Sequence, residues 1–187
     1  MSRQRTVRKP LILFGEGPTE GLFLERIKQL YSKRLADKIV TVGSGSGGSS
    51  GSVLLELKKK HLVTGNGETP ALVLIDADNG LDQEARDILK EYTNKNGECR
   101  ITVVYSEPQC LEGLLLDLLD DLPPKSRQTS DNLKKYFQDN YLGSRDHVRK
   151  NFKMKRADLF PQQLLDQKIT SHPVMKEVSL FLGLTES

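Results

Sequence analysis

Apolar and polar residues alternate along the first two thirds of the chain in the pattern of βαβ units. Short apolar runs have the length of buried strands, and the segments after them repeat apolar residues at helical spacing. We predict strands at Leu11–Phe14, Lys38–Val42, Ala71–Ile75 and Arg100–Tyr105. We predict the helices between and after them at Pro18–Ala36, Ser52–His61, Leu81–Asn94 and Leu111–Leu119. This order favours an α/β fold with an open, mostly parallel four-stranded sheet and helices on both faces.

The pattern changes after Pro123-Pro124, where no further strand is evident. The remaining apolar spacing predicts helices at Asp131–Asn140, Ser144–Lys155, Pro161–Gln167 and Pro173–Leu182. A length of 187 residues suits one compact domain with a small appended part. We therefore divide the chain into a basic arm (1–9), an α/β domain that carries the candidate catalytic residues (10–122) and a C-terminal helical annex (123–187).

Composition narrows the class of protein. A net charge of +3 is only mildly basic and does not by itself require a nucleic-acid partner. The two cysteines, Cys99 and Cys110, suit a reducing compartment. The apolar run behind the basic first residues stops at Phe14, which is too short for a signal peptide or a membrane span. We expect a cytoplasmic protein without a membrane partner.

Acidic residues follow two of the predicted strands. Glu16 comes directly after the first strand, between Gly15 and Gly17, and Asp76 and Asp78 follow the third. The carboxyl ends of neighbouring parallel strands open into one crevice, where several carboxylates are tolerable only if a cation or a proton shares the site. Oxygen ligands of this kind suit Mg²⁺. The sequence therefore predicts a metal-binding catalytic centre, although Asp78-Asn79-Gly80 is also good turn chemistry.

Two further acids fall near the same edge of the sheet. Glu20 lies in the first turn of the helix that Pro18 begins, where a carboxylate favours the helix dipole whether or not it also serves a site. Glu112 interrupts a leucine series, so it faces either solvent or the site, and the periodicity leaves both open. The sequence also leaves open whether Glu16 is a metal ligand or a general acid or base.

The glycine- and serine-rich segment 43–51 is the one low-complexity stretch of the chain. It lacks the Lys-Ser/Thr end of a P-loop and the spacing of a dinucleotide fingerprint. Its composition favours a flexible connector. The alternative is that its backbone amides meet a phosphate at the start of the next helix.

Cations gather in the annex. On a helix, Arg145, Arg149, Lys153 and Arg156 fall at i, i+4, i+8 and i+11, which forms one basic stripe. Such a stripe suits the phosphates of a nucleic acid, but a solvated charged face has the same pattern.

The order of these motifs resembles the TOPRIM domain, a metal-dependent catalytic module, and is most similar to its RloB-like and OLD-type nuclease branch. Residues 16–20, Glu-Gly-Pro-Thr-Glu, resemble the EGxTE motif of that branch. Residues 106–112 resemble its serine-to-glutamate segment ahead of a leucine-rich helix. The resemblance covers roughly Pro10 to Leu119, and the annex carries no motif of the family.

The resemblance implies a nuclease that hydrolyses phosphodiester bonds in DNA or RNA with Mg²⁺ or Mn²⁺. Two ions are implied, one held by Glu16, Asp76 and Asp78 and a second completed by Glu20 and Glu112. The branch is associated with phage defence and with a partner ATPase, and we carry both over as expectations. Two other functions stay open: a metal-dependent phosphatase or nucleotide-processing enzyme, and a non-catalytic subunit that binds a partner ATPase through the annex. An oligomer is compatible with the sequence.

Overall fold

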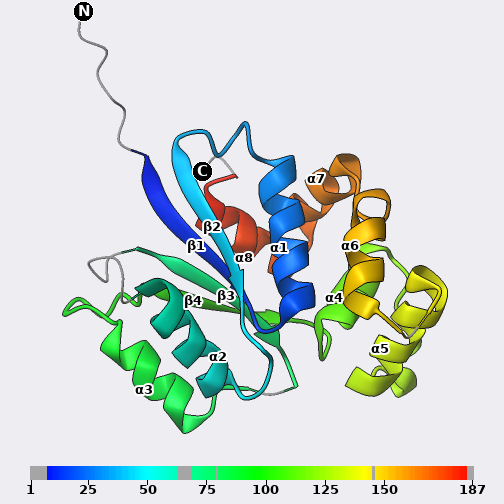
Figure 1. Cartoon of the computed structure of the whole chain (residues 1–187), viewed down its shortest axis with the longest axis horizontal. Helices are drawn as coiled ribbons and strands as arrows, with labels where there is room; N and C mark the ends of the chain where they lie inside the picture. The colour runs from blue at the N-terminus through cyan, green and yellow to red at the C-terminus, as the bar shows by residue number, and fades with distance from the viewer. Residues whose placement is uncertain (1–7, 63–68, 79, 145, 185–187) are drawn as a thin grey trace, which may run out of the picture.

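A computed structural model describes residues 8–62, 69–78, 80–144 and 146–184. Its centre is one open sheet of four parallel strands in the order β2-β1-β3-β4 (Figure 1). The strands are β1 (Lys9–Gly15), β2 (Lys38–Ser44), β3 (Ala71–Asp76) and β4 (Ile101–Ser106). The predicted α/β class with a four-stranded parallel sheet is confirmed.

Helices follow each strand and then fill the C-terminal part. They are α1 (Pro18–Leu30), α2 (Ser50–Leu57), α3 (Gln83–Glu91), α4 (Leu111–Leu118), α5 (Ser130–Phe137), α6 (Val148–Leu159), α7 (Gln162–Ser171) and α8 (Pro173–Leu182). The wider turns η1 (Lys58–Leu62) and η3 (Gln138–Leu142) extend α2 and α5, and η2 (Lys125–Arg127) precedes α5. The predicted helices over 52–61 and 131–140 are therefore each an α-helix that widens at its end.

Alternating residues of the central strands divide the core into two layers. Ile12 and Phe14 of β1 face α2 and α3, whereas Leu11 and Leu13 face α1, α4 and α8. All six residues of β3 are buried, as expected of a strand covered on both faces. The sheet is thus enclosed between two helical layers, as predicted (Figure 1).

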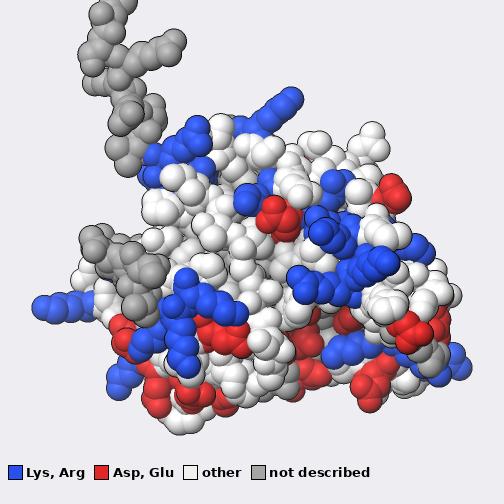
Figure 2. Space-filling model, in the orientation of Figure 1, with Lys and Arg blue, Asp and Glu red and all other residues white. Residues whose placement is uncertain are grey.

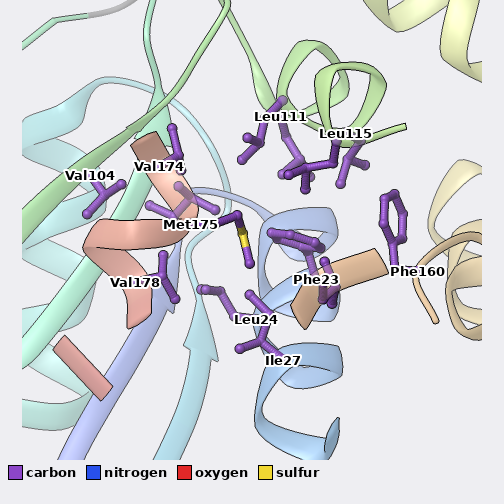
Figure 3. Packing of buried hydrophobic residues seen from close by; sticks show 14 of the residues in the cluster. Phe23, Leu24, Ile27, Val104, Leu111, Leu115, Phe160, Val174, Met175 and Val178 are labelled. Carbon is purple, nitrogen blue, oxygen red and sulfur yellow. The ribbon is translucent and has the colours of Figure 1, made fainter. Parts of the chain in front are cut away.

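Helix α8 brings the end of the annex back onto the sheet. Its Val174, Met175 and Val178 belong to the same buried cluster as Phe23 of α1 and Val104 of β4. The Met175 side chain points toward α1 across the middle of this layer (Figure 3). The annex and the α/β domain therefore share one hydrophobic core, and truncating Met175 to Ala would cost about 2–5 kcal/mol.

Helix α1 ends at Leu30, before the predicted boundary at Ala36. Beyond this point Tyr31 and Leu35 are buried although they lie in turns, and their positions continue the helical spacing of apolar residues. The Tyr31 hydroxyl donates a hydrogen bond to Asp166 of α7 at 2.8 Å. Burial of these side chains thus produced the periodicity that we read as helix.

Candidate functional site

Three strand ends place polar groups at one edge of the sheet. Asp76 is the last residue of β3 and pairs in register with Ser106, the last residue of β4. Glu16 follows β1 directly, and its backbone N–H donates to the Leu74 carbonyl of β3 at 2.9 Å. Since the strands are parallel, these groups lie together at the carboxyl edge, where open α/β sheets bind ligands.

Glu16 and Asp76 are in direct contact. A carboxylate oxygen of Glu16 accepts a hydrogen bond from the Asp76 backbone N–H at 2.9 Å, and both side chains are buried. Burial raises the pKa of Glu16, and the nearby charges of Asp76 and Asp78 add to that effect. The Asp76 N–H bond acts in the opposite direction but does not cancel it.

The Asp76 carboxylate is held by neighbours on both sides. Its Oδ1 accepts hydrogen bonds from the Ser106 hydroxyl at 3.0 Å and from the Leu111 backbone N–H at 2.9 Å. The Leu111 N–H belongs to the first residue of α4, where the backbone amides have no partner within the helix. The loop between β4 and α4 therefore fixes the direction of this carboxylate.

A lysine of the annex also reaches Asp76, and our sequence analysis did not select it. The Lys134 Nζ of α5 lies 3.6 Å from Asp76 Oδ2. Burial opposes the charge of Lys134, but the carboxylates of Asp76 and Glu112 outweigh burial and raise its pKa. Lys134 sits in an ordinary amphipathic helix, so no local signal marks it. Only the packing of α5 against α4 brings it to the acids.

Glu20 both caps α1 and joins the buried acids. Its carboxylate accepts the Gly17 backbone N–H at 3.0 Å, which closes the first turn of the helix. The side chain is nevertheless buried, and burial raises its pKa to about 8, with further contributions from Asp76, Glu112 and Glu16. Glu20 therefore both caps α1 and lies beside the other buried acids.

Gly15 allows this close approach of α1 to the end of β1. A Cβ on Gly15 would lie 2.5 Å from the Glu20 Cβ and 2.6 Å from the Gly21 backbone nitrogen. Any side chain at position 15 would therefore displace the helix start that carries Glu20.

Glu112 faces inward. Only 8% of its surface is exposed, and the leucines around it in α4 are buried as well. Burial raises its pKa, whereas its own backbone N–H and the charge of Lys134 act to lower it. Between the two positions that the sequence left open, solvent and site, the structure places Glu112 beside Asp76 and Lys134.

Asp78 differs from the other four acids because its side chain is exposed. Its backbone N–H donates to the Gln109 carbonyl at 3.0 Å, which joins the loop after β3 to the loop after β4. Its charge still raises the pKa of Glu16. Asp78 thus lies at the mouth of the acid group, and its neighbour Asn79 is outside the described residues.

We call Glu16, Glu20, Asp76 and Glu112 the acid cluster. Its potential ligand atoms are all carboxylate oxygens, the type that Mg²⁺ and Mn²⁺ prefer. Burial, with a smaller contribution from neighbouring acids, raises the pKa of Glu16, Glu20 and Glu112, and a bound cation would favour their ionised forms. The cluster therefore fits a divalent ion in charge and donor type. Within the described parts of the chain, no three His, Cys, Asp or Glu side chains are placed to ligate one ion together. Ligation would therefore need these carboxylates to move closer together than they lie in this structure.

The predicted basic stripe is only partly a free surface. Arg149 and Lys153 of α6 are exposed, whereas Arg156 is half-buried and donates to the Leu22 carbonyl of α1 at 3.0 Å. Arg145 lies outside the described residues. Lys and Arg gather over α6 on the face shown in Figure 2. Arg156 therefore contributes to helix packing, and Arg149 and Lys153 remain as candidates for contact with phosphates.

The glycine- and serine-rich segment is tied to the end of β1. The N–H groups of Gly45 and Gly47 donate to the carbonyls of Gly15 and Glu16 at 2.9 and 3.0 Å. At the start of α2, the Gly51 N–H donates to the Asp82 carboxylate at 3.1 Å. Asp82 also caps α3, so a carboxylate of the chain itself holds the position that we considered for a phosphate.

The fold and the acid cluster define a class: an α/β protein with buried carboxylates at the carboxyl edge of a parallel sheet. Comparison with protein-family models, curated proteins and solved structures finds no significant match. The TOPRIM resemblance therefore stays a prediction from the motifs. None of the helices in the described ranges has the length and apolar character needed to cross a bilayer.

Proposed function

We propose that this chain is a metal-dependent nuclease that hydrolyses phosphodiester bonds with Mg²⁺ or Mn²⁺ at the acid cluster. The observation that carries the proposal is the direct bond between Glu16 and the Asp76 backbone, within a buried group that also holds Glu20 and Glu112. Burying so many carboxylates is costly unless they bind a cation or protons. Such an arrangement is expected at a functional site rather than in a core.

The chain's own residues have distinct parts in this proposal. Asp76, fixed by Ser106 and Leu111, would be the best oriented ligand, with Glu16 after the neighbouring strand β1 and Asp78 in the loop after β3. Glu20 and Glu112 would complete a second position. A divalent ion bound there would neutralise charge on a phosphate and polarise its oxygens. Lys134 brings a further positive charge to the same edge, where it can contact a phosphate oxygen.

Arg149 and Lys153 would hold the strand outside the site. They are exposed cations on α6, which packs against α1, the helix that carries Glu20. Contacts of this kind bind phosphates without reading sequence. Because the cysteines are free, with Cys99 exposed, we place the protein in the reducing cytoplasm.

The test is cleavage of single- and double-stranded DNA and RNA with Mg²⁺, Mn²⁺ or EDTA, comparing the wild-type chain with Asp76→Asn. Asp87→Asn, which neutralises an exposed acid of α3, is the matched control. We expect cleavage that requires metal, is lost in Asp76→Asn and survives in Asp87→Asn. Equal cleavage by both variants would identify a contaminant. Turnover of mononucleotides without cleavage of polynucleotides would instead identify a phosphatase.

A further inference from the structure

A cavity opens where the α/β domain passes into the annex. It has a volume of about 640 Å³ and lies between the segment after α4 and the exposed side of α5. Its wall combines four kinds of group: the rings of Pro123, Pro124 and Tyr136, the cations Arg127 and Lys135, the acids Asp121 and Asp139, and the amides Asn132 and Asn140. This size falls in the range of small-molecule sites.

One helix serves both the cavity and the acid cluster. Lys134 of α5 reaches Asp76, whereas the adjacent Lys135 lines the cavity with Tyr136. Consecutive helical residues point about 100° apart, so these side chains leave α5 in different directions. A strand that contacts Lys134 at the acid cluster would have to turn about the same helix to reach Lys135 in the cavity.

Two cations and two acids line the cavity, and the cations are the groups that can meet an anionic ligand, because the acids already have partners. The Asp121 carboxylate accepts the Tyr141 hydroxyl at 2.6 Å and lies 3.3 Å from the Tyr136 hydroxyl. Burial and this carboxylate raise the pKa of Tyr141 to about 12, so the hydroxyl remains a donor to Asp121. Arg127 and Lys135, in contrast, form no ion pair within the described part of the chain. The two cations are therefore available to an anionic group in the cavity, although the acids of the lining balance their charge.

The polar groups also suit a flat heterocycle. Asn140 donates its amide N–H to the Tyr136 carbonyl at 2.8 Å, which fixes the side chain and leaves its amide oxygen as an acceptor. Asn132 is exposed at the start of α5 and offers both a donor and an acceptor. A nucleobase could lie against the ring of Tyr136 and bond through its edge to these amides.

We propose that this cavity binds one nucleotide of the substrate strand, with its phosphate on Arg127 and Lys135 and its base against Tyr136. This inference rests on the proposed nuclease function and extends it to the substrate class. A base enters such a cavity only when it is unstacked, so the substrate is single-stranded or frayed at that position. These contacts would accept any of the bases, so the cavity should not select a particular sequence.

The first test measures binding without catalysis. AMP, adenosine and inorganic phosphate are titrated by calorimetry into the full-length Asp76→Asn chain in EDTA. We expect AMP to bind at least about tenfold more tightly than phosphate or adenosine, because only AMP engages both the cations and the ring wall. No detectable AMP binding at millimolar concentration, or equal binding of phosphate alone, would overturn the proposal.

Variants then locate the binding. The double variant Arg127→Ala, Lys135→Ala should weaken AMP binding by about tenfold or more. Lys125→Ala is the matched control, since Lys125 is exposed in η2 beside Arg127 but does not line this cavity. Tyr136→Ala should weaken binding by about tenfold, and Tyr136→Phe should restore it because the ring face is retained. Unchanged binding in the double variant would place AMP elsewhere and refute the assignment.

Cleavage kinetics separate this inference from the proposed function. With the otherwise wild-type chain, Tyr136→Ala should raise KM for a single-stranded oligonucleotide by about tenfold, with kcat changed little. Absence of any nuclease activity together with AMP binding would reject the nuclease function while leaving a nucleotide site. Nuclease activity with an unchanged KM would reject the cavity as a substrate subsite.

Discussion

The Glu16 carboxylate accepts a hydrogen bond from the Asp76 backbone N–H at 2.9 Å, so the acids at the ends of β1 and β3 form one unit. The same Asp76 pairs in register with Ser106 and lies 3.6 Å from Lys134. Three strand ends and one annex helix are thereby joined through a single residue, Asp76. Changes at any of these positions are expected to act on the same site.

Protonation of Glu20 makes the metal-free protein sensitive to pH. Its pKa is raised from 4.5 to about 8, so the folded chain keeps a proton that the unfolded chain releases between these values. The free energy of unfolding should therefore fall as pH rises through this window, by on the order of a few kcal/mol. Glu20→Gln should remove most of this loss and keep an acceptor for the Gly17 N–H.

This prediction is checked by urea unfolding in EDTA at pH 5 and pH 8. The wild-type chain should lose more stability than Glu20→Gln between the two values. Glu25→Gln, a half-buried position on the same helix, serves as the control. Parallel losses in the wild-type and Glu20→Gln chains would contradict a raised pKa at Glu20.

The Ser106 hydroxyl is expected to set metal affinity through Asp76. Ser106→Ala removes the bonds from this hydroxyl to the Ile75 carbonyl and to Asp76 Oδ1. Loss of such a supporting contact typically weakens metal affinity by about 10- to 100-fold. The Mg²⁺ midpoint for cleavage should rise accordingly. Ser130→Ala is a matched control, since its buried hydroxyl makes no hydrogen bond in the described chain, and a similar rise there would refute the role.

Lys134→Met tests the positive charge at the acid cluster. The Lys134 ammonium lowers the pKa of Glu16 and of Glu112, so its removal should raise both values. Because ligation needs ionised carboxylates, the acid side of the pH–activity profile should move to higher pH and activity at neutral pH should fall. Lys90→Met on α3 should leave the profile in place. An unshifted profile in Lys134→Met would show that this charge does not act on the acids.

The two ends of the basic stripe are expected to respond differently. Arg149→Ala with Lys153→Ala should lower the salt dependence of single-strand binding by roughly 1.4 in the log–log slope, because two phosphate contacts are lost. Arg156→Ala should instead cost about 0.5–1.5 kcal/mol of stability through its bond to Leu22. Filter binding across a salt series and urea unfolding distinguish the two effects. An unchanged slope in the double variant would exclude α6 from the interface.

Gly113 of α4 is expected to tolerate no side chain. A Cβ there would lie 2.0 Å from the Pro108 carbonyl oxygen, so α4 and the loop that bonds Asp76 would have to separate. Gly113→Ala should cost about 1–3 kcal/mol and reduce cleavage. Gly17→Ala should cost less, because its added methyl meets the movable end of Glu20 at 3.0 Å. Urea unfolding of both variants checks the order, and equal stability of Gly113→Ala and the wild type would contradict it.

Local sequence determined the strands, the order of strands and helices and the acids at the strand ends. Apolar runs encode burial on both faces of a sheet, and a residue that follows a parallel strand must lie at its carboxyl edge. Glu16 and Asp76 could therefore be brought together from their positions alone. The residue at which α1 ends could not be predicted in this way, since Tyr31 and Leu35 keep a helical spacing although they are buried in turns.

Tertiary packing decided which side chains complete the site. Periodicity left Glu112 facing either solvent or the site, and its burial beside Asp76 depends on how α4 docks. Lys134 and Arg156 look alike in sequence as cations of amphipathic helices. Lys134 reaches from the annex to Asp76 at the end of β3, whereas Arg156 donates to the Leu22 backbone carbonyl of α1. Such contacts join residues far apart in the chain, so their geometry is set by the packing of whole helices and not by local pattern.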